Sequence, residues 1–232
     1  MKFIDFFDKY QGRYALKKHK STLKSIAHWI DYYHYSYSPE ELPTILLSES
    51  VKLKKFLSDN PNSADEFLPK AYAIFSETAR SFFGYAPNKV QFLGAILLWN
   101  GKAVEMKSGE GKTLTAAIVA YLAGLTGRGV HVVTTNDYLA ERDREWMNSL
   151  FSRLGVSCGA ITQNATPETR KDEYKKDITY VANQEIGFDY LRDNLAASAS
   201  DKVLRGFPFA IIDEMDSILI DEARTPLIIS RQ

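Results

Sequence analysis

Residues Met106–Thr113 have the sequence Met-Lys-Ser-Gly-Glu-Gly-Lys-Thr, which is the strongest structural signal in the chain. It follows a short apolar run at Ala103–Glu105, which predicts a strand, and it opens a helical pattern at Thr113–Leu125. A strand, a glycine-rich loop and a helix can together hold a nucleoside triphosphate, because backbone N–H groups and the helix dipole point at the phosphate oxygens. The sequence therefore predicts a phosphate-binding loop in an α/β domain.

Individual residues of this loop suggest individual roles. We expect Lys112 to reach the β- and γ-phosphates and the Thr113 hydroxyl to ligate Mg²⁺. Gly109 and Gly111 would let the backbone approach the ligand, since side chains there would keep it away. Met106 stands where the consensus G-x-x-x-x-G-K-[ST] has glycine. The alternative is an ordinary turn between a strand and a helix.

Composition permits this prediction without requiring it. The chain has 232 residues, 45% hydrophobic and 25% charged, as in a soluble globular protein with one large or two small domains. Its formal net charge is zero, which gives no indication of nucleic-acid binding. The single cysteine, Cys158, lies in an apolar run and is expected to be a buried small hydrophobe, with a reactive thiol as the alternative. We see neither a signal peptide nor an apolar run approaching about 18 residues, so a cytosolic location is expected.

Residues 1–80 are expected to form a helical N-terminal segment that packs on a motor domain spanning residues 81–232. A helix start is predicted at Ser38–Leu42, from an N-cap serine, a proline and acidic residues in the first turn. A further helix is predicted at Ser48–Leu57. Another is predicted at Ala64–Phe83, where Pro69 should cause a kink or a break.

Two features of the N-terminal segment leave alternatives open. Residues 1–24 hold seven Lys/Arg against two Asp, with an aromatic stripe at Phe3–Tyr10. They predict either a helix on an anionic lipid surface or a helix packed on the main domain with a solvated basic face. His28 and His34 flank a tyrosine-rich stretch, where aromatic packing is favoured over metal binding.

After residue 85 short β-branched runs alternate with amphipathic patterns, which predicts βαβ units, a parallel sheet and helices on both faces. Ligands on such sheets bind at the carboxyl ends of the strands. The predicted strands are Ala103–Glu105, Val130–Thr135, Val156–Ile161, Ile178–Ala182 and Phe209–Ile212. The predicted helices are Thr113–Leu125, Tyr138–Leu154, Pro167–Lys175 and Glu185–Asn194.

A second motif supplies carboxylates. The apolar strand Phe209–Ile212 ends in Asp213 and Glu214, which it would deliver beside the phosphate loop. Asp213 would hold Mg²⁺, partly through water, and Glu214 would polarise an attacking water. The alternative is an exposed acidic turn.

Longer segments resemble a known family. An Asp-Glu-x-Asp sequence after a strand is typical of DEAD-type helicase-like motors. The segments Asp213–Ser230, Gly187–Asn194, Gly129–Thr134 and Asn136–Ala140 are similar to those of SecA, the bacterial preprotein translocase ATPases, in which the loop also starts with Met. The resemblance is dense from about residue 81 to 230, thinner from 40 to 80, and is not extended to the first 38 residues.

The resemblance implies a RecA-like fold and a set of site residues. Gln91 matches the adenine-reading glutamine of the family, since its amide can both donate to and accept from the adenine edge. Asp213 and Glu214 match the metal-water and catalytic carboxylates. The stretches Thr134–Asp137 and Asn183–Glu185 match segments that face a polymer substrate or link it to the nucleotide, although surface turns would look similar. The phosphate and Mg²⁺ contacts match Gly109, Glu110, Gly111, Lys112 and Thr113.

Some positions depart from the family pattern. Met215 stands for the usual valine, Ala182–Gln184 for Thr-Asn-Asn, and Ala95 for a second glycine. Together with the N-terminal sequence they suggest a divergent member. Family members continue past Gln232 into a preprotein cross-linking domain and a second RecA-like domain, which supplies an arginine to the ATP cleft. This chain is therefore expected to be a fragment or truncated product, or to need a partner chain, and to bind ATP and Mg²⁺ while turning over slowly.

The resemblance implies an ATPase that drives preprotein export at the inner face of the cytoplasmic membrane. Its implied partners are preproteins, a membrane channel and, for the basic N-terminus, anionic lipid, with no nucleic acid. A DEAD-type nucleic-acid helicase motor is one alternative, which net charge zero does not favour. A nucleotide-binding regulatory module without turnover is the other.

Overall fold

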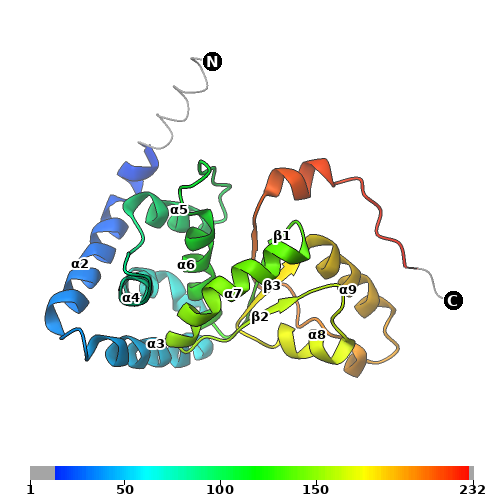
Figure 1. The fold of residues 1–232 in the computed structure, drawn as a ribbon, viewed down its shortest axis with the longest axis horizontal. Helices are drawn as coiled ribbons and strands as arrows, with labels where there is room; N and C mark the ends of the chain where they lie inside the picture. Colours follow the sequence, from blue (N-terminus) through cyan, green and yellow to red (C-terminus); the bar gives the residue numbers. More distant parts are fainter. Residues whose placement is uncertain (1–13, 230–232) are drawn as a thin grey trace, which may run out of the picture.

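The computed structural model describes residues 14–229, and a four-stranded parallel sheet in the order β2-β3-β1-β4 lies at its centre (Figure 1). β1 and β3 are buried along their whole length, as expected for strands covered on both faces. The sheet confirms the predicted α/β class. The strands are β1 (Val130–Thr134), β2 (Cys158–Ile161), β3 (Ile178–Ala182) and β4 (Ala210–Ile212).

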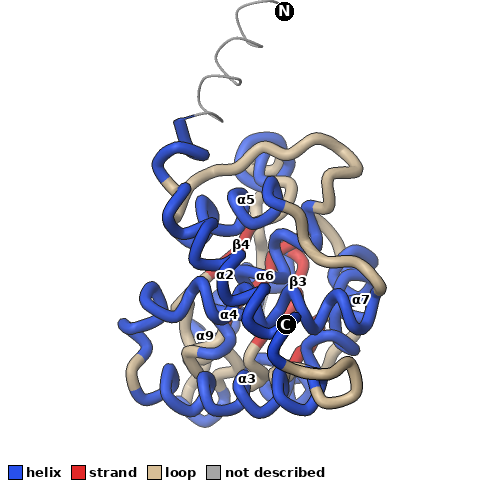
Figure 2. The backbone as a smooth tube through the Cα atoms, turned by 90° about the vertical axis from the view of Figure 1, so that its left-hand side faces the viewer, coloured by secondary structure: helices blue, strands red, loops and turns tan. Residues whose placement is uncertain are grey.

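Helices enclose this sheet, and Figure 2 shows the strands (red) in the middle of the surrounding helices (blue). The N-terminal helices are α2 (Lys20–Ser36), α3 (Leu42–Asp59), α4 (Ala64–Phe83) and α5 (Lys89–Trp99). The helices that alternate with strands are α6 (Lys112–Leu125), α7 (Asp137–Arg153), α8 (Pro167–Tyr174) and α9 (Asn183–Leu195). Short 3₁₀ turns lie at Pro61–Ser63 and Ala199–Asp201, and a π-helical turn lies at Ser217–Asp221.

The strand order fixes the face on which each helix lies. The connection from β1 through α7 to β2 runs one way across the sheet, whereas those through α8 and α9 run the other way. Because parallel crossovers are right-handed, α7 covers one face and α8 and α9 cover the other. Two separate hydrophobic clusters agree with this: Val132 belongs to the large cluster with α4, α6 and α7, whereas Val133 packs with Tyr174 of α8.

The N-terminal helices share the core of the sheet domain. In α4 every residue from 71 to 79 is buried, which is typical of a helix surrounded by others. The Ser50 hydroxyl of α3 lies 2.7 Å from the Tyr121 hydroxyl of α6 and donates to the Leu154 carbonyl at 2.6 Å. Lys54 of α3 forms an ion pair with Asp177 at 2.6 Å, directly before β3. These contacts join the two parts closely, while the domain boundary near residue 80 stays a prediction.

The predicted strand at Ala103–Glu105 is wrong. Residues 102–107 form no ladder in the described part of the chain. The apolar side chain of this run packs on a helix instead, because Val104 and Met106 lie 3.8 and 3.5 Å from where a Cβ on Gly94 of α5 would stand.

Two further boundaries differ from the prediction. The helix expected to start at Ser38 begins at Leu42, after a turn in which the Glu41 N–H donates to the Ser38 hydroxyl at 3.3 Å. It then continues as one helix through the segment predicted as separate. Pro69 does not break α4, because burial of the following turns outweighs one lost backbone hydrogen bond.

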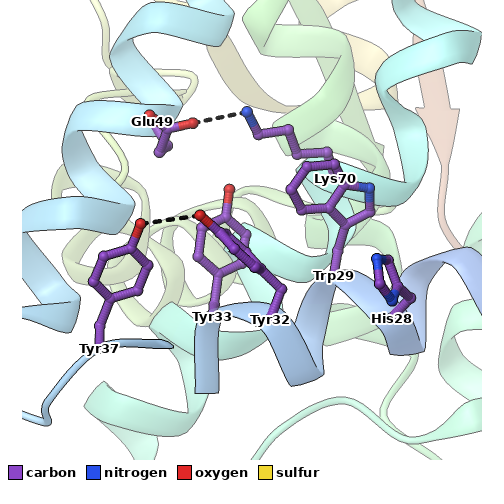
Figure 3. A pocket seen from close by; sticks show the side chains of 7 residues that line it. All are labelled: His28, Trp29, Tyr32, Tyr33, Tyr37, Glu49 and Lys70. Atoms are coloured by element: carbon purple, nitrogen blue, oxygen red, sulfur yellow. Dashed lines mark hydrogen bonds and ion pairs between the residues drawn. The ribbon is translucent and has the colours of Figure 1, made fainter. Parts of the chain in front are cut away.

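The tyrosine-rich stretch packs as an aromatic cluster, as favoured from the sequence. Its cavity has a volume of about 430 Å³. Two of the lining residues drawn in Figure 3, Glu49 and Lys70, form an ion pair at 2.7 Å. Lys70 also lies 5.3 Å from the centre of the Trp29 ring, and the Tyr32 and Tyr37 hydroxyls lie 3.2 Å apart. Glu49 and Lys70 are therefore paired, as are Tyr32 and Tyr37, whereas the buried Tyr33 hydroxyl has no hydrogen-bond partner among the described residues.

Other sequence expectations have mixed outcomes. Cys158 is buried, and burial raises the pKa of its thiol to about 12, which confirms the small hydrophobe. None of the helices described between residues 14 and 229 combines the length and apolar character that a membrane crossing requires. The aromatic stripe at Phe3–Tyr10 lies outside the described residues.

Arg170 of α8 holds a buried ionic network on the second face of the sheet. Its guanidinium donates to Glu185 at 2.5 Å and to Asp189 at 2.8 Å, both on α9. The Tyr174 hydroxyl donates to Asp189 at 2.9 Å. Arg170, Glu185 and Asp189 are 4%, 7% and 0% exposed, so Glu185 depends on this cation for compensation, whereas Asp189 also pairs with Arg192 at 2.9 Å.

We expect Arg170→Met to lower the free energy of unfolding by about 3–5 kcal/mol, because it leaves the buried Glu185 without a cation and leaves Asp189 only the exposed Arg192. Urea denaturation measures the change. The matched control is Lys175→Ala, which removes an exposed pair with Asp172 and should cost less than about 1 kcal/mol. Equal losses in the two variants would contradict a stabilising role for the buried network.

His131 of β1 is wholly buried, and neither ring nitrogen has a hydrogen-bond partner. The ring packs edge-on against Tyr174 and near Phe207, each 5.6 Å away between centroids. Burial, with a smaller contribution from the Arg205 charge, lowers the pKa of His131 to about 4. The imidazole is therefore neutral in the folded protein near pH 7.

This burial predicts a pH dependence of stability. The folded-state pKa lies below the unfolded value of about 6.5, so the unfolded chain takes up the proton first and stability falls as pH decreases from about 6.5 toward 4. Between pH 7.5 and 5, His131→Leu should lose about 2 kcal/mol less unfolding free energy than the parent chain. Denaturant titrations at both pH values measure the unfolding free energies. An equal change in unfolding free energy between the two pH values for both proteins would contradict the prediction.

Candidate functional site

The loop before α6 has the backbone that an anion site requires. Gly109 and Gly111 adopt left-handed φ values of +84° and +83°, which side chains disfavour. α6 begins at Lys112 directly after Gly111, and no side chain within the described residues caps its first amides. Lys112 is exposed and Thr113 is half-buried. The free N–H groups and the dipole of α6 thus face the loop, where they favour a bound anion.

Glu110 folds back within the loop. Its carboxylate accepts from the Lys107 N–H at 2.9 Å, while its own N–H donates to the Lys107 carbonyl at 3.2 Å. These reciprocal bonds give the loop a defined shape.

Gln91 joins the loop to the start of α5. Its Oε1 accepts from the Asn88 N–H at 2.8 Å, and the Asn88 side chain accepts from the Gln91 N–H, so the two form a capping box. The Gln91 Nε2 donates to the Glu110 carbonyl at 3.0 Å. A Cβ on Gly111 would stand 2.1 Å from Nε2, so the glycine makes room for this amide.

Met106, the departure from the loop consensus, is 9% exposed and lies against α5 near Gly94. Burial of its thioether fixes the first residue of the loop, and a glycine at this position could not supply that packing.

The two predicted carboxylates follow β4. The Asp213 N–H donates to the Val133 carbonyl at 2.9 Å, which extends the ladder to β1, and Asp213 Oδ1 accepts from the Glu214 N–H at 3.0 Å. Glu214 has φ +51°, the one positive value at a non-glycine residue between residues 14 and 229. Such a backbone costs roughly 1–3 kcal/mol and occurs often at functional sites.

The segment that leads into α7 contacts one of these carboxylates. The Thr135 hydroxyl donates to Glu214 Oε2 at 3.2 Å, and Asn136 caps α7 by accepting from the Leu139 N–H at 3.0 Å. Burial raises the pKa of Asp143, which is paired with Arg142 at 2.7 Å, and the charges of Asp213 and Glu214 raise it further. The segment therefore responds to the charge at the end of β4.

A cavity of about 460 Å³ opens beside the loop. Gly109–Gly111 of the loop, Asn88 and Gln91 at the start of α5, and the aromatic residues Tyr85 and Trp146 are among the residues that line it. A volume of this size lies within the range of small-molecule sites.

The structure brings some predicted site residues together and leaves others apart. Gln91 and the loop from Gly109 to Gly111 meet at the cavity. In the described part of the chain, no hydrogen bond or ion pair joins Asp213 or Glu214 to Gly109–Thr113. Asn183 donates to Glu222 at 2.8 Å, whereas Glu185 serves the Arg170 network.

Sequence reasoning missed four residues of this region. An asparagine three residues before Gln91 at the start of an apolar run is a capping-box signal that could have identified Asn88. Thr135 lies in a segment selected for another role. No local pattern singled out Tyr85 or Trp146.

The donor set fits a nucleoside triphosphate with Mg²⁺. A Cβ at Gly111 would collide with the Gln91 amide, and the two left-handed glycines keep side chains off the cradle. The Thr113 hydroxyl and the Asp213 carboxylate offer the oxygen ligands that Mg²⁺ prefers.

Alanine at the two loop glycines should have unequal effects. At Gly109 a Cβ meets nothing within 4 Å, so Gly109→Ala bears only the left-handed strain of about 1–2 kcal/mol. Gly111→Ala adds the loss of the Gln91–Glu110 hydrogen bond, about 0.5–1.5 kcal/mol, because the amide must move aside. Urea denaturation of both variants measures the difference. A Gly111→Ala variant no less stable than Gly109→Ala would contradict the contact.

Comparisons with known proteins agree with the resemblance seen in the sequence. A family model described as SecA DEAD-like domain matches residues 5–232, so the likeness reaches further toward the N-terminus than the sequence motifs indicated. The protein translocase subunit SecA of Treponema denticola is 58% identical over 168 residues, 72% of this chain and 18% of that protein. The SecA of Prochlorococcus marinus (strain NATL1A) is 52% identical over 199 residues, 85% of this chain and 21% of that protein.

A third relative, the chloroplastic SecA of Spinacia oleracea, is 52% identical over 184 residues, 79% of this chain and 18% of that protein. The chain thus spans about a fifth of the length of the relatives it matches. The match of the family model over nearly the whole chain shows the family. This chain belongs to the SecA family, in which it corresponds to the SecA DEAD-like domain.

Proposed function

We propose that this chain binds ATP with Mg²⁺ as the nucleotide-binding part of a SecA-type motor, which couples ATP hydrolysis to preprotein export across the cytoplasmic membrane. The observation that carries the proposal is the uncapped start of α6 behind two left-handed glycines, next to a cavity that Gln91 lines. Relatives named protein translocase subunit SecA support the coupling to export.

The loop and α6 would bind the triphosphate. Backbone N–H groups of Gly109–Lys112 would donate to phosphate oxygens, and the Lys112 ammonium would reach the β- and γ-phosphates. The Gln91 amide would meet the base edge. The Thr113 hydroxyl and Asp213, the latter partly through water, would hold Mg²⁺. When bound, Mg²⁺ would neutralise charge that develops on the transferred phosphoryl group.

Glu214 would act as the general base. Its carboxylate would accept a proton from a water placed for in-line attack, and in this structure it is held by the Thr135 hydroxyl. The backbone of Glu214 is already strained. If the Thr135 hydroxyl released the Glu214 carboxylate, the residue could therefore move without first leaving a relaxed backbone conformation.

Turnover by the chain alone should be slow. The loop and α6 would contact the phosphates from one side, and an arginine from a second RecA-like domain or a partner chain would complete the cleft. Such an arginine contributes on the order of 10³–10⁵ in rate in related phosphoryl transfer.

We propose that residues 1–80 are a helical segment packed on a motor domain of residues 81–232. We also propose preproteins and a membrane channel as partners, at the inner face of the membrane.

ATP binding and turnover by this chain test the proposal. Lys112→Ala should weaken MgATP binding about 10- to 100-fold, because it removes a charge-assisted hydrogen bond to phosphate. Glu214→Gln should bind MgATP like the parent chain and lose residual turnover. Calorimetry and phosphate release measure the two effects.

The matched control is Lys102→Ala, an exposed lysine just before the loop that is assigned no contact with the nucleotide. Binding that Lys112→Ala leaves unchanged would overturn the phosphate site. Robust turnover of the parent chain that Glu214→Gln abolishes would contradict only the need for a second domain. Salt-sensitive binding of single-stranded RNA would favour the helicase alternative.

A further inference from the structure

The aromatic cavity of about 430 Å³ in the N-terminal helices is separate from the nucleotide cavity, since the two share no lining residue. Its walls come from α2 and the turn after it, with Glu49 of α3 and Lys70 of α4 (Figure 3). Its volume lies within the range of small-molecule sites. The lining residues are His28, Trp29, Tyr32, Tyr33, Tyr37, Glu49 and Lys70, and none is assigned a nucleotide contact.

The rings of α2 form a preordered aromatic wall. Trp29 and Tyr33 stack with a centroid distance of 6.0 Å and an interplanar angle of 29°. Tyr32 meets both rings edge-on, at 5.6 Å from Trp29 and 5.3 Å from Tyr33. A flat ring that packs on this wall would gain aromatic contacts, and little side-chain entropy would be lost because the rings already hold one another.

The Tyr33 hydroxyl is a buried donor without an acceptor. The residue is 1% exposed, and within residues 14–229 no group forms a hydrogen bond with its hydroxyl. Burial, and after it the charge of Glu49, raises the pKa of this hydroxyl, so it stays protonated near pH 7. Figure 3 shows the hydroxyl on the side of the ring that faces Glu49 and Lys70. A buried polar group in this state gains free energy from a partner, because its desolvation is already complete.

The end of the cavity next to this hydroxyl has an excess of positive charge. Glu49 accepts from the Lys70 ammonium at 2.7 Å and from the Lys52 ammonium at 3.0 Å, so two cations share one carboxylate. Each ammonium has three donors, and Lys70 uses one of them on Glu49. Lys70 also lies 5.3 Å from the centre of the Trp29 ring, so the cation–π position of the wall is already taken. Free donors and net positive charge therefore favour an anionic acceptor over an organic cation.

We propose that this cavity binds a small planar aromatic carboxylate. The ring packs on the wall of Trp29 and Tyr33, and the carboxylate accepts from the Tyr33 hydroxyl and the Lys70 ammonium. The hydroxyl itself is closed to water, so the ligand reaches it by displacing Tyr32, which is 43% exposed and whose hydroxyl has only an exposed contact, with Tyr37 at 3.2 Å. This site is independent of the proposed function, because it uses none of the nucleotide residues.

Three probes with the same ring test the proposal on the 232-residue chain. They are indole-3-acetate, its neutral isostere indole-3-acetamide, and the cation tryptamine, and calorimetry gives their affinities. Indole-3-acetate should bind at least about tenfold more tightly than either of the others, because only it offers a charged acceptor to both donors. An excess of inorganic tripolyphosphate, which would occupy the phosphate loop, should leave this affinity unchanged.

Two variants separate the hydroxyl from the ammonium. Tyr33→Phe removes one oxygen that has no partner, so the fold should be retained, while the affinity for indole-3-acetate should fall about tenfold. Lys70→Met should remove the preference for indole-3-acetate over indole-3-acetamide. The matched controls are Tyr35→Phe, an 81% exposed tyrosine on α2, and Lys55→Met, an exposed lysine on α3, and both should bind like the parent chain.

Thermal unfolding of each variant identifies loss of fold, and if Lys70→Met is unfolded, Tyr33→Phe alone decides. Several outcomes would overturn the site. One is the absence of indole-3-acetate binding at millimolar concentration. Another is equal affinity of the parent chain for indole-3-acetate and indole-3-acetamide, which would indicate an apolar contact only. Affinity that Tyr33→Phe leaves unchanged, or that tripolyphosphate abolishes by competition, would also overturn it.

Discussion

The parallel hydrogen bonding between β1 and β4 is the constraint on which the candidate site depends. Val133 pairs with Ile212, and the ladder ends with the Asp213 N–H on the Val133 carbonyl. The next residues of the two strands therefore leave the sheet side by side, and this brings Thr135 to Glu214. A slip of one residue would turn every side chain of β4 to the opposite face and separate that pair. The position of the carboxylates thus follows from backbone register before any side-chain chemistry.

The face of the sheet that α8 and α9 cover combines apolar packing with buried charges. Its hydrophobic cluster is small, and next to it lies the buried Arg170 network between α8 and α9. Buried ion pairs add little net free energy, but they penalise arrangements that separate the partners. The buried, neutral His131 lies on this face as well. Neither its ring nor the Arg170 ion pairs can shift far without an energetic cost.

The sequence predicted most of the sheet domain because its elements carry local signals. The strand Ile178–Ala182 was predicted to the residue, and the helix predicted at Thr113 begins one residue earlier, since β-branched runs and a glycine-lysine start are visible without tertiary context. Ala103–Glu105 failed for the opposite reason: an apolar run does not say whether it pairs with a strand or packs on Gly94. The helix break predicted at Pro69 does not occur, because burial of α4 outweighs the helix-breaking preference of proline.

For the candidate site, the motif selected the loop and the family resemblance selected Gln91, whereas neither predicted how the cavity brings them together. Tyr85 and Trp146 are 61 positions apart in the numbering (146 minus 85) and become neighbours of the Phe83 ring only through the packing of α4 against α7. The strain at Glu214 has no sequence signal either, because glutamate is not a residue that favours positive φ.

The two hydrogen bonds of the Gln91 side-chain amide couple two segments of the chain. One amide closes the first turn of α5 and also holds a carbonyl of the loop, 19 residues later in the chain. The Gln91 amide therefore couples the loop to the start of α5, in addition to the packing of Met106 near Gly94. By thermodynamic reciprocity, anything that stabilises the first turn of α5 also orders the loop, and anything that draws Gln91 away loosens both. The rigidity of the loop therefore depends on α5, the helix that precedes it in the chain.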